Sequence, residues 1–274
     1  MRIALDKVAG ERVAKYLCRI MQSVFVLAVG LAITGCSDTD RATDLSEGIT
    51  NKKVRQYLLE HPELVLDDPE IARAISSARS ARQHQARALW RKSILAKNAS
   101  LLDSALTPAS GDVGSQVTII EFYDYQCMPC KASYPELKQI KKTEKDVRII
   151  YAQLPVFGSY STLAARGAIG AHRQGLFQDY HDALMTANVR LDAGSIFTMA
   201  ADIGLDIEKL QADMRDPKVI HYLEQMRILA DELDVTGTPA FVVGDSILRG
   251  GTGVKELKLE LNRQRTQSHL PSGV

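Results

Sequence analysis

The motif that most constrains this chain is a pair of closely spaced cysteines, Cys127-Met128-Pro129-Cys130, at the junction of two periodic segments. The apolar run 117–123 before it has strand character, and the segment 131–138 after it has helical spacing. A thiol at a helix N-terminus faces unpaired backbone N–H groups and the positive end of the helix dipole, which both favour the thiolate. The sequence therefore predicts a redox-active dithiol at a strand-to-helix junction.

Residues 1–35 have the pattern of a secretory signal peptide. Five basic and two acidic side chains accompany the apolar stretch 24–33, which is shorter than the roughly 20 residues of a membrane-spanning helix. The stretch ends in Ile33-Thr34-Gly35-Cys36, which resembles the bacterial lipobox, so we expect acylation of Cys36 after cleavage. The alternative is an ordinary signal with a chance cysteine. Cleavage would change the net charge from +1 to about −2, which gives no indication of a nucleic-acid partner.

The remaining cysteines favour chemistry over a structural role. Cys18 would leave with the signal and Cys36 would carry lipid, so only Cys127 and Cys130 remain for the mature chain. A disulfide between such near neighbours closes a very small loop and adds little stability, whereas exported structural frameworks usually carry several longer-range bridges. We therefore expect this pair to exchange electrons.

A helical leader at 49–100 is expected to follow a polar tether at 36–48. One helix should end before Pro62, and a second should begin at Asp68-Pro69-Glu70 and run to about residue 98. Seven basic residues and no acidic ones occur in 71–100, together with a stripe of mostly small residues: Ala74, Ala78, Ala81, Ala88 and Leu95. This stripe predicts a packing face for another copy of the chain, through residues 50–98. The alternatives are a solvated helix that leans on its own catalytic domain, or a basic face that contacts anionic lipid.

The catalytic domain is predicted to be of the α/β class and to span residues 101–268. A strand at 116–123, the dithiol helix at 127–143 and a strand at 147–155 form a βαβ unit. The next strand, at 240–243, comes only after a helical insertion at about 159–234, and 246–249 forms a hairpin with it. An amphipathic helix from Val254 to Arg265 is expected to close the domain.

Several segments resemble the DsbA-like branch of the thioredoxin superfamily. They are the motif 121–131, Leu154-Pro155-Val156-Phe157-Gly158, Gly175-Leu176-Phe177 with 181–185, and Thr236-Gly237-Thr238-Pro239-Ala240-Phe241. The leader around 54–63 resembles that of suppressor-of-copper-sensitivity-C-like proteins. The resemblance covers most of the mature chain. It implies a thioredoxin-like fold with a helical insert, preceded by an oligomer-forming leader, and an exported thiol–disulfide oxidoreductase that needs no cofactor.

The resemblance also implies roles for individual residues. Cys127 would be the exposed nucleophile, and Cys130, one helical turn later, would resolve the mixed disulfide. Glu121 is the odd residue in an apolar strand, and an unpaired buried carboxylate prefers to hold its proton. Such an acid could shuttle protons toward Cys130. The alternative is a Glu121 carboxylate that reaches solvent at the strand end.

Substrate contacts are expected on both sides of the dithiol. Pro239 would be a cis-proline facing the cysteines, with the Thr238 backbone beside it presented to an extended substrate strand. Met128 and Pro129 would contact substrate from between the cysteines. Pro129 in the first helical turn removes no intrahelical hydrogen bond, but Met128 brings neither charge nor an aromatic donor. This departure from relatives, which commonly have proline first and an aromatic or histidine second, leaves the redox potential unpredicted.

The predicted partners are exported cysteine-containing proteins, a membrane redox protein and further copies of the chain. The lipid anchor would hold the protein at a membrane, facing the periplasm or the outer face of the cell. Thr238 before the proline resembles isomerase and reductase members, with a disulfide-donating oxidase as the alternative. No metal site is expected, because the six histidines lack ligand spacing and the dithiol supplies only two ligands. An alternative of another class is a copper- or zinc-binding lipoprotein that uses the dithiol.

Overall fold

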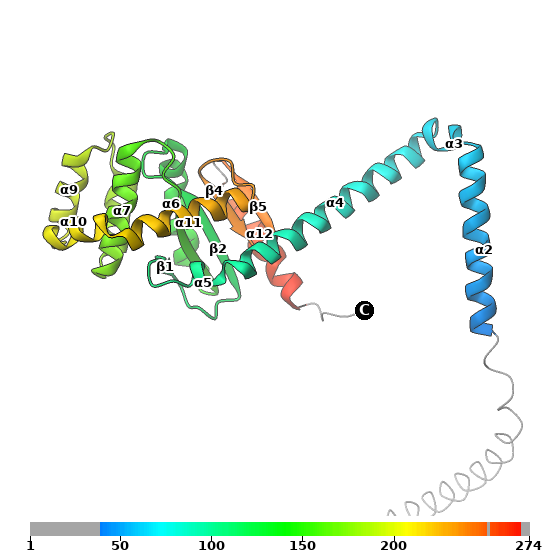
Figure 1. Cartoon of the computed structure of the whole chain (residues 1–274), viewed down its shortest axis with the longest axis horizontal. Helices are drawn as coiled ribbons and strands as arrows, with labels where there is room; N and C mark the ends of the chain where they lie inside the picture. Colours follow the sequence, from blue (N-terminus) through cyan, green and yellow to red (C-terminus); the bar gives the residue numbers. More distant parts are fainter. Residues whose placement is uncertain (1–38, 251–252, 270–274) are drawn as a thin grey trace, which may run out of the picture. The chain divides into compact units, whose positions relative to one another are not determined.

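The computed structural model describes residues 39–250 and 253–269 (Figure 1). The predicted signal peptide at 1–35 and the lipidation site Cys36 lie outside the described residues. The chain divides into two compact units, one up to Arg79 and the other from Ser80 onward.

The first unit is helical. It contains α2 (Thr39–Glu60), α3 (Glu63–Leu66) and the first part of α4 (Pro69–Lys97). Helix α2 begins inside the segment expected to be a tether, and residues 39–60 contain no proline that would interrupt the helix. No side chain in 50–79 is buried.

The predicted start of α4 is confirmed. The Asp68 carboxylate accepts hydrogen bonds from the backbone N–H groups of Glu70 at 2.7 Å and Ile71 at 3.1 Å, so it satisfies donors that the first helical turn leaves unpaired. Pro69 occupies the first helical position, where no intrahelical bond is lost.

The second unit is built on a five-stranded sheet in the order β1-β3-β2-β4-β5. The central strand β2 (Val117–Tyr123) runs parallel to β3 (Val147–Gln153) and antiparallel to β4 (Ala240–Val243). The edge strands are β1 (Ala109–Ser110) and β5 (Ser246–Arg249). The βαβ unit and the hairpin expected from the sequence are therefore confirmed.

The helices also follow the predicted order. The dithiol helix α6 (Met128–Thr143) joins β2 to β3, and five helices fill the insertion between β3 and β4: α7 (Ser159–Arg173), α8 (Phe177–Thr186), α9 (Ala193–Asp202), α10 (Ile207–Arg215) and α11 (Pro217–Glu232). The short α5 (Ala99–Leu102) precedes β1, and α12 (Val254–His269) follows β5.

The sheet buries both of its faces. Alternate residues of β2 project to opposite sides, so Ile119, Glu121 and Tyr123 share one face while Ile120 and Phe122 share the other. We call the first side the dithiol face, because its core includes both cysteines, and it is covered mainly by α6, α8, α9, α10 and α12. The other side, the apolar face, is covered by α5, α11 and the end of α4. Helix α7 packs against both cores.

The last turns of α4 are attached to the second unit. Ile94 is buried in the core of the apolar face, and Leu95, predicted to lie on the leader's stripe, packs against the same core. The Arg91 guanidinium donates to the Asp245 carbonyl oxygen at 2.6 Å, and Lys97 forms an ion pair with Glu232 at 2.6 Å. This end of α4 thus leans on the catalytic domain, as one alternative for the leader foresaw.

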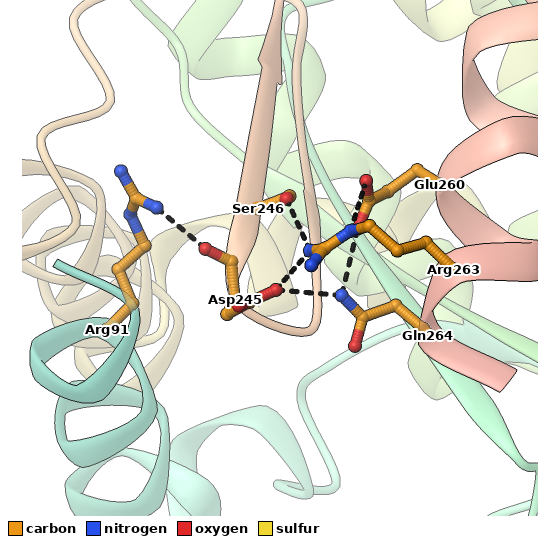
Figure 2. A network of polar contacts seen from close by, with 6 residues as sticks. All are labelled: Arg91, Asp245, Ser246, Glu260, Arg263 and Gln264. Carbon is orange, nitrogen blue, oxygen red and sulfur yellow. Dashed lines mark hydrogen bonds and ion pairs between the residues drawn. The ribbon is translucent and has the colours of Figure 1, made fainter. Parts of the chain in front are cut away.

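The turn that receives Arg91 is itself fixed by α12 (Figure 2). The Asp245 carboxylate accepts hydrogen bonds from Arg263 and, at 2.8 Å, from the Gln264 side chain. Arg263 also donates to the Ser246 hydroxyl at 2.8 Å and pairs with Glu260. The β4–β5 turn therefore connects α4 with α12.

Candidate active site

Cys127 lies where β2 gives way to α6, at the N-cap of the helix. Its Sγ accepts a hydrogen bond from the backbone N–H of Cys130 at 3.2 Å and donates one to the carbonyl oxygen of Thr238 at 3.4 Å. Both cysteines are free thiols. Pro129 lies in the first turn of α6, so it removes no intrahelical hydrogen bond.

Cys127 is more shielded than the sequence suggested. The residue is only 1% exposed, so the prediction of an exposed nucleophile is wrong for this state of the protein. The reason is tertiary: the sulfur is held between the N-terminus of α6 and the loop that carries Thr238, a residue 111 positions away. The exposed members of the motif are Met128, at 71%, and Pro129.

The two thiols differ sharply in acidity. The hydrogen bond with the Cys130 thiol lowers the pKa of Cys127 to about 6, although burial opposes this shift. Burial, reinforced by the hydrogen bond to Cys127, raises the pKa of Cys130 far above its ordinary value. At neutral pH the pair therefore consists of a Cys127 thiolate, which no longer donates to Thr238, and a Cys130 thiol, and thiolate is the nucleophilic form.

Glu121 is fully buried on the dithiol face. Neither of its carboxylate oxygens has a hydrogen-bond partner among the residues that the structure describes. Burial, and then the charge of Cys127, raises the pKa of Glu121 to about 8. The expectation of a carboxyl group that prefers its proton is met, and the alternative in which Glu121 reaches solvent is wrong, because the residue is 0% exposed.

The loop opposite the dithiol has the predicted geometry. The Thr238–Pro239 peptide bond is cis, as the resemblance implied for Pro239. The carbonyl oxygen of Thr238 contacts the Cys127 sulfur. The structure thus brings together the cysteines, Met128, Pro129, Thr238 and Pro239 at one end of the sheet.

Asp124 has a part in the site that the sequence analysis did not assign. Its buried carboxylate accepts hydrogen bonds from the backbone N–H groups of Gln126 at 2.7 Å, Val156 at 2.7 Å and Phe157 at 3.1 Å. It thereby joins the loop before the dithiol to the loop after β3. The sequence signal that could have identified Asp124 was an acidic residue between the apolar strand and the cysteine motif.

A buried aromatic cluster around His181 was also missed. The Tyr125 hydroxyl contacts His181 Nδ1 at 3.0 Å and the Tyr123 hydroxyl at 3.1 Å. Burial lowers the pKa of His181 to about 3, so this imidazole is neutral, and its Nε2 has no partner. Besides Tyr125, four aromatic rings contact the imidazole of His181: those of Tyr123, Tyr134, Tyr151 and Phe177. Sequence spacing held no sign of this, since Tyr125 and His181 are 56 positions apart.

The described residues contain no group of three or more histidine, cysteine, aspartate or glutamate side chains placed to hold a metal ion. What the site does offer is a thiolate, a neighbouring thiol and a buried acid on one face of the sheet. These groups can form and break disulfide bonds with no other reagent than a second disulfide or dithiol.

A dithiol at the start of a helix that follows the central strand, opposite a cis-proline loop, defines a thioredoxin-like thiol–disulfide oxidoreductase. The family model described as a DsbA-like thioredoxin domain matches residues 118–262, more than half of the chain. The chain therefore belongs to the DsbA-like family, as its sequence motifs suggested.

Solved structures agree with this assignment. A thioredoxin-like oxidoreductase from Silicibacter pomeroyi is 34% identical, covers 61% of this chain and 96% of its own, and superimposes with a TM-score of 0.59. The catalytic domain of Proteus mirabilis ScsC is 27% identical, covering 64% and 98%, with a TM-score of 0.59. A periplasmic thioredoxin-like protein from Salmonella enterica serovar Typhimurium is 29% identical, covering 62% and 95%, with a TM-score of 0.57.

The curated relatives are longer proteins. The Na⁺/H⁺ antiporter NhaA of Herminiimonas arsenicoxydans is 28% identical over 172 residues, which are 61% of this chain and 27% of that protein. The chain spans about a quarter of the length of the curated relatives it matches. Among the described residues, no helix is both long and apolar enough to cross a membrane.

Proposed function

We propose that this protein is an exported, membrane-anchored enzyme that exchanges disulfides with cysteine-containing exported proteins through Cys127 and Cys130. The observation that carries the proposal is the position of the Cys127 sulfur, which accepts the Cys130 N–H at the start of α6 and contacts the Thr238 carbonyl oxygen. The low pKa of Cys127, about 6, makes this sulfur the nucleophile at neutral pH.

In the first step, the Cys127 thiolate attacks one sulfur of a substrate disulfide. A mixed disulfide forms, and the other substrate sulfur leaves as a thiolate. Because Met128 is exposed and the Thr238–Pro239 loop lies opposite, an extended substrate segment can be held on both sides of Cys127.

In the second step, Cys130 loses its proton and attacks Cys127. The substrate leaves with two reduced sulfurs, and the Cys127–Cys130 disulfide remains. The proton needs an acceptor, because the pKa of Cys130 is raised far above its ordinary value. The thiolate charge of Cys127 is one cause of the raised pKa of Glu121, so loss of that charge in the mixed disulfide lowers the Glu121 pKa. The Glu121 carboxylate then becomes available when Cys130 must ionise.

Two substitutions test these roles on a reduced protein mixed with a disulfide substrate. Cys127→Ser should abolish exchange, because Cys130 alone remains a protonated, buried thiol. Cys130→Ala should accumulate a covalent complex with substrate through Cys127, seen by mass spectrometry and reversed by reductant. Equal turnover by the Cys127→Ser variant would contradict the assignment.

The direction of exchange is proposed to be isomerisation or reduction. Support comes from Thr238 before the cis-proline and from the similarity to ScsC. A membrane partner would then keep the dithiol reduced. Equilibration with glutathione buffers measures the reduction potential, and a strongly oxidising pair would favour the disulfide-donating alternative. The redox state of Cys127 and Cys130 in freshly harvested cells distinguishes the two directions directly.

Export and anchoring are proposed from the signal pattern at 1–35 and from Cys36. The similar Salmonella protein is described as periplasmic, which supports an exported location. Metabolic labelling with a fatty acid should mark the intact protein and leave the Cys36→Ser variant unlabelled. Labelling of both would contradict the lipobox.

Oligomerisation through residues 50–98 is proposed from the exposed apolar side chains of the leader, which include Leu59, Leu66 and Leu89. The end of α4 belongs to the catalytic core, since Ile94 is buried there, so a deletion should stop short of Arg91. A chain lacking residues 50–88 should be a monomer by light scattering, exchange disulfides normally and isomerise poorly. A monomeric intact chain would remove the proposal.

A further inference from the structure

A cleft of about 680 Å³ opens next to the dithiol, on the side of the helical insertion. Its walls come from three places in the second unit: the start of α6, the loop after β3 and the loop that follows α8. The residues that line the cleft include Met128, Lys131, Phe157, Val189 and Arg190. Gln126 and Met128, the neighbours of Cys127 in sequence, both line the cleft.

The walls of the cleft are tied to the core. The buried Asp124 carboxylate holds the backbone N–H of Phe157 at 3.1 Å. Across the cleft, the Lys131 ammonium on α6 donates to the carbonyl oxygen of Ala187 at 2.6 Å, which fixes the loop after α8 to the dithiol helix. The cleft is therefore formed before any ligand binds, and a ligand does not have to bear the cost of ordering it.

The cleft exposes apolar side chains. Phe157 is 52% exposed and Val189 is 57% exposed, and Met128 from the dithiol motif adds a flexible thioether. Apolar groups gathered around a concave site bind apolar ligand groups, because contact removes both surfaces from water. A large side chain next to a substrate cysteine fits this lining.

The charges in the cleft have one sign. Lys131 and Arg190 line it, and none of the other described residues that line it is an aspartate or a glutamate. Two carboxylates contact lining residues, but Asp124 is buried and Asp182, at the Tyr134 hydroxyl, is paired with Lys138 at 2.7 Å. The exposed Arg190 is thus placed to meet a negative charge on a bound polypeptide.

We infer that this cleft selects substrate polypeptides in which a large apolar residue and an acidic residue flank the reacting cysteine. The apolar side chain lies against Phe157 and Val189, and the acidic side chain pairs with Arg190. This inference rests on the proposed function, because the cleft acts on exchange only through attack by Cys127 on the bound substrate.

The test uses the reduced full chain and short peptides whose single cysteine forms a mixed disulfide with mercaptoethanol. The peptides carry Phe-Glu, Phe-Lys, Gly-Glu or Gly-Gly beside the cysteine, and the second-order rate of reduction is measured for each. We expect Phe-Glu to react about fivefold faster than Phe-Lys, the range of an exposed ion pair, and faster than Gly-Glu.

Variants locate the effect. Arg190→Glu should abolish or reverse the preference for Glu over Lys, and Val189→Ser should reduce the preference for Phe over Gly. The matched control is Arg215→Glu, which makes the same charge change at an exposed position on α10 outside the cleft and should leave both preferences intact. Equal rates for all four peptides, or a loss of preference in the control, would overturn the inference.

A neutral small disulfide separates this inference from the proposed function. Bis(2-hydroxyethyl) disulfide is too small and too uncharged to use the cleft, so the protein and its Arg215→Glu variant should reduce it at the same rate. If the protein reduces it but shows no peptide preference, the cleft proposal fails and the proposed function stands. If the protein does not reduce it, the proposed function fails, and the cleft proposal with it.

Discussion

The two faces of the sheet are equally buried but hold different chemistry. On β2, Glu121 and Phe122 are consecutive and both are 0% exposed, yet they point to opposite sides. The dithiol face contains Glu121, Gln153 and His181, each with at least one side-chain polar atom that has no partner. The apolar face is filled mainly by aliphatic side chains of β2, β3, β4 and α11, with Tyr222 as its main polar group.

This contrast shows where the molecule gives up stability for reactivity. A buried polar group without a hydrogen bond destabilises a fold, and among the described residues the dithiol face holds two such titratable groups, Glu121 and His181. Substitutions on the apolar face should therefore change stability alone. Substitutions on the dithiol face should change how the protein responds to pH.

The largest effect on stability is expected from Phe122→Ala on the apolar face. Removing a fully buried ring should lower the free energy of unfolding by about 3–5 kcal/mol, because it leaves a cavity as well as lost burial. Denaturant unfolding measures this change. The pH midpoint for alkylation of Cys127, about 6, should stay the same. A shift of a full pH unit would show that the two faces are not independent.

The neighbouring Glu121→Gln should change the pH dependence of stability. The pKa of Glu121 is about 8 in the folded protein and near 4.5 when unfolded, so its contribution is fully present below pH 4.5 and is lost as pH rises toward 8. The variant lacks this loss. The difference in free energy of unfolding between the variant and the parent should therefore shift in favour of the variant by about 3 kcal/mol from pH 5 to pH 7.5. Parallel curves for the two proteins would mean that Glu121 is ionised when buried.

His181→Phe should act in the opposite pH range. The pKa of His181 is about 3 in the folded protein, below its ordinary 6.5, so its contribution is present above pH 6.5 and is lost as pH falls. When the pH falls from 7 to 5, the free energy of unfolding should decrease by about 2 kcal/mol less in the variant than in the parent. Thermal unfolding at several pH values measures this. The same dependence of stability on pH in the variant and the parent would contradict a neutral, buried His181.

The smallest effect is expected from Tyr125→Phe. Its hydroxyl bridges Tyr123 and His181, and loss of a buried hydrogen bond of this kind costs about 1 kcal/mol. Tyr160→Phe removes a more exposed hydroxyl and should be neutral. If the two variants were equally stable, the bridge would contribute nothing to folding.

The fold could be predicted because its signals are local. The apolar run 117–123, the cysteine spacing and the Asp68-Pro69 helix start each depend on neighbours in sequence, and each is confirmed. Glu121 was predicted to be buried for the same reason, since it interrupts an apolar strand. The predicted tether at 36–48 is largely covered by helix α2, in a polar segment that contains no helix-breaking proline.

The surroundings of the cysteines could not be predicted in the same way. The recess of Cys127 depends on Thr238, and the neutrality of His181 depends on rings from β2, β3, α6 and α8. Hydrophobic periodicity in the sequence does not predict contacts between such distant segments. Asp124 was visible as part of the motif, but its three N–H partners include two from the loop after β3.

The burial of Cys127 affects how readily oxidants damage its thiol in an oxidising environment. Acidic thiols are the ones that peroxides convert most readily to sulfinic and sulfonic acids, which thiol exchange does not repair. Here the acidic sulfur is covered, while the Met128 thioether beside it lies open to solvent. A small oxidant thus meets a methionine first, and the sulfoxide that forms there is chemically reversible.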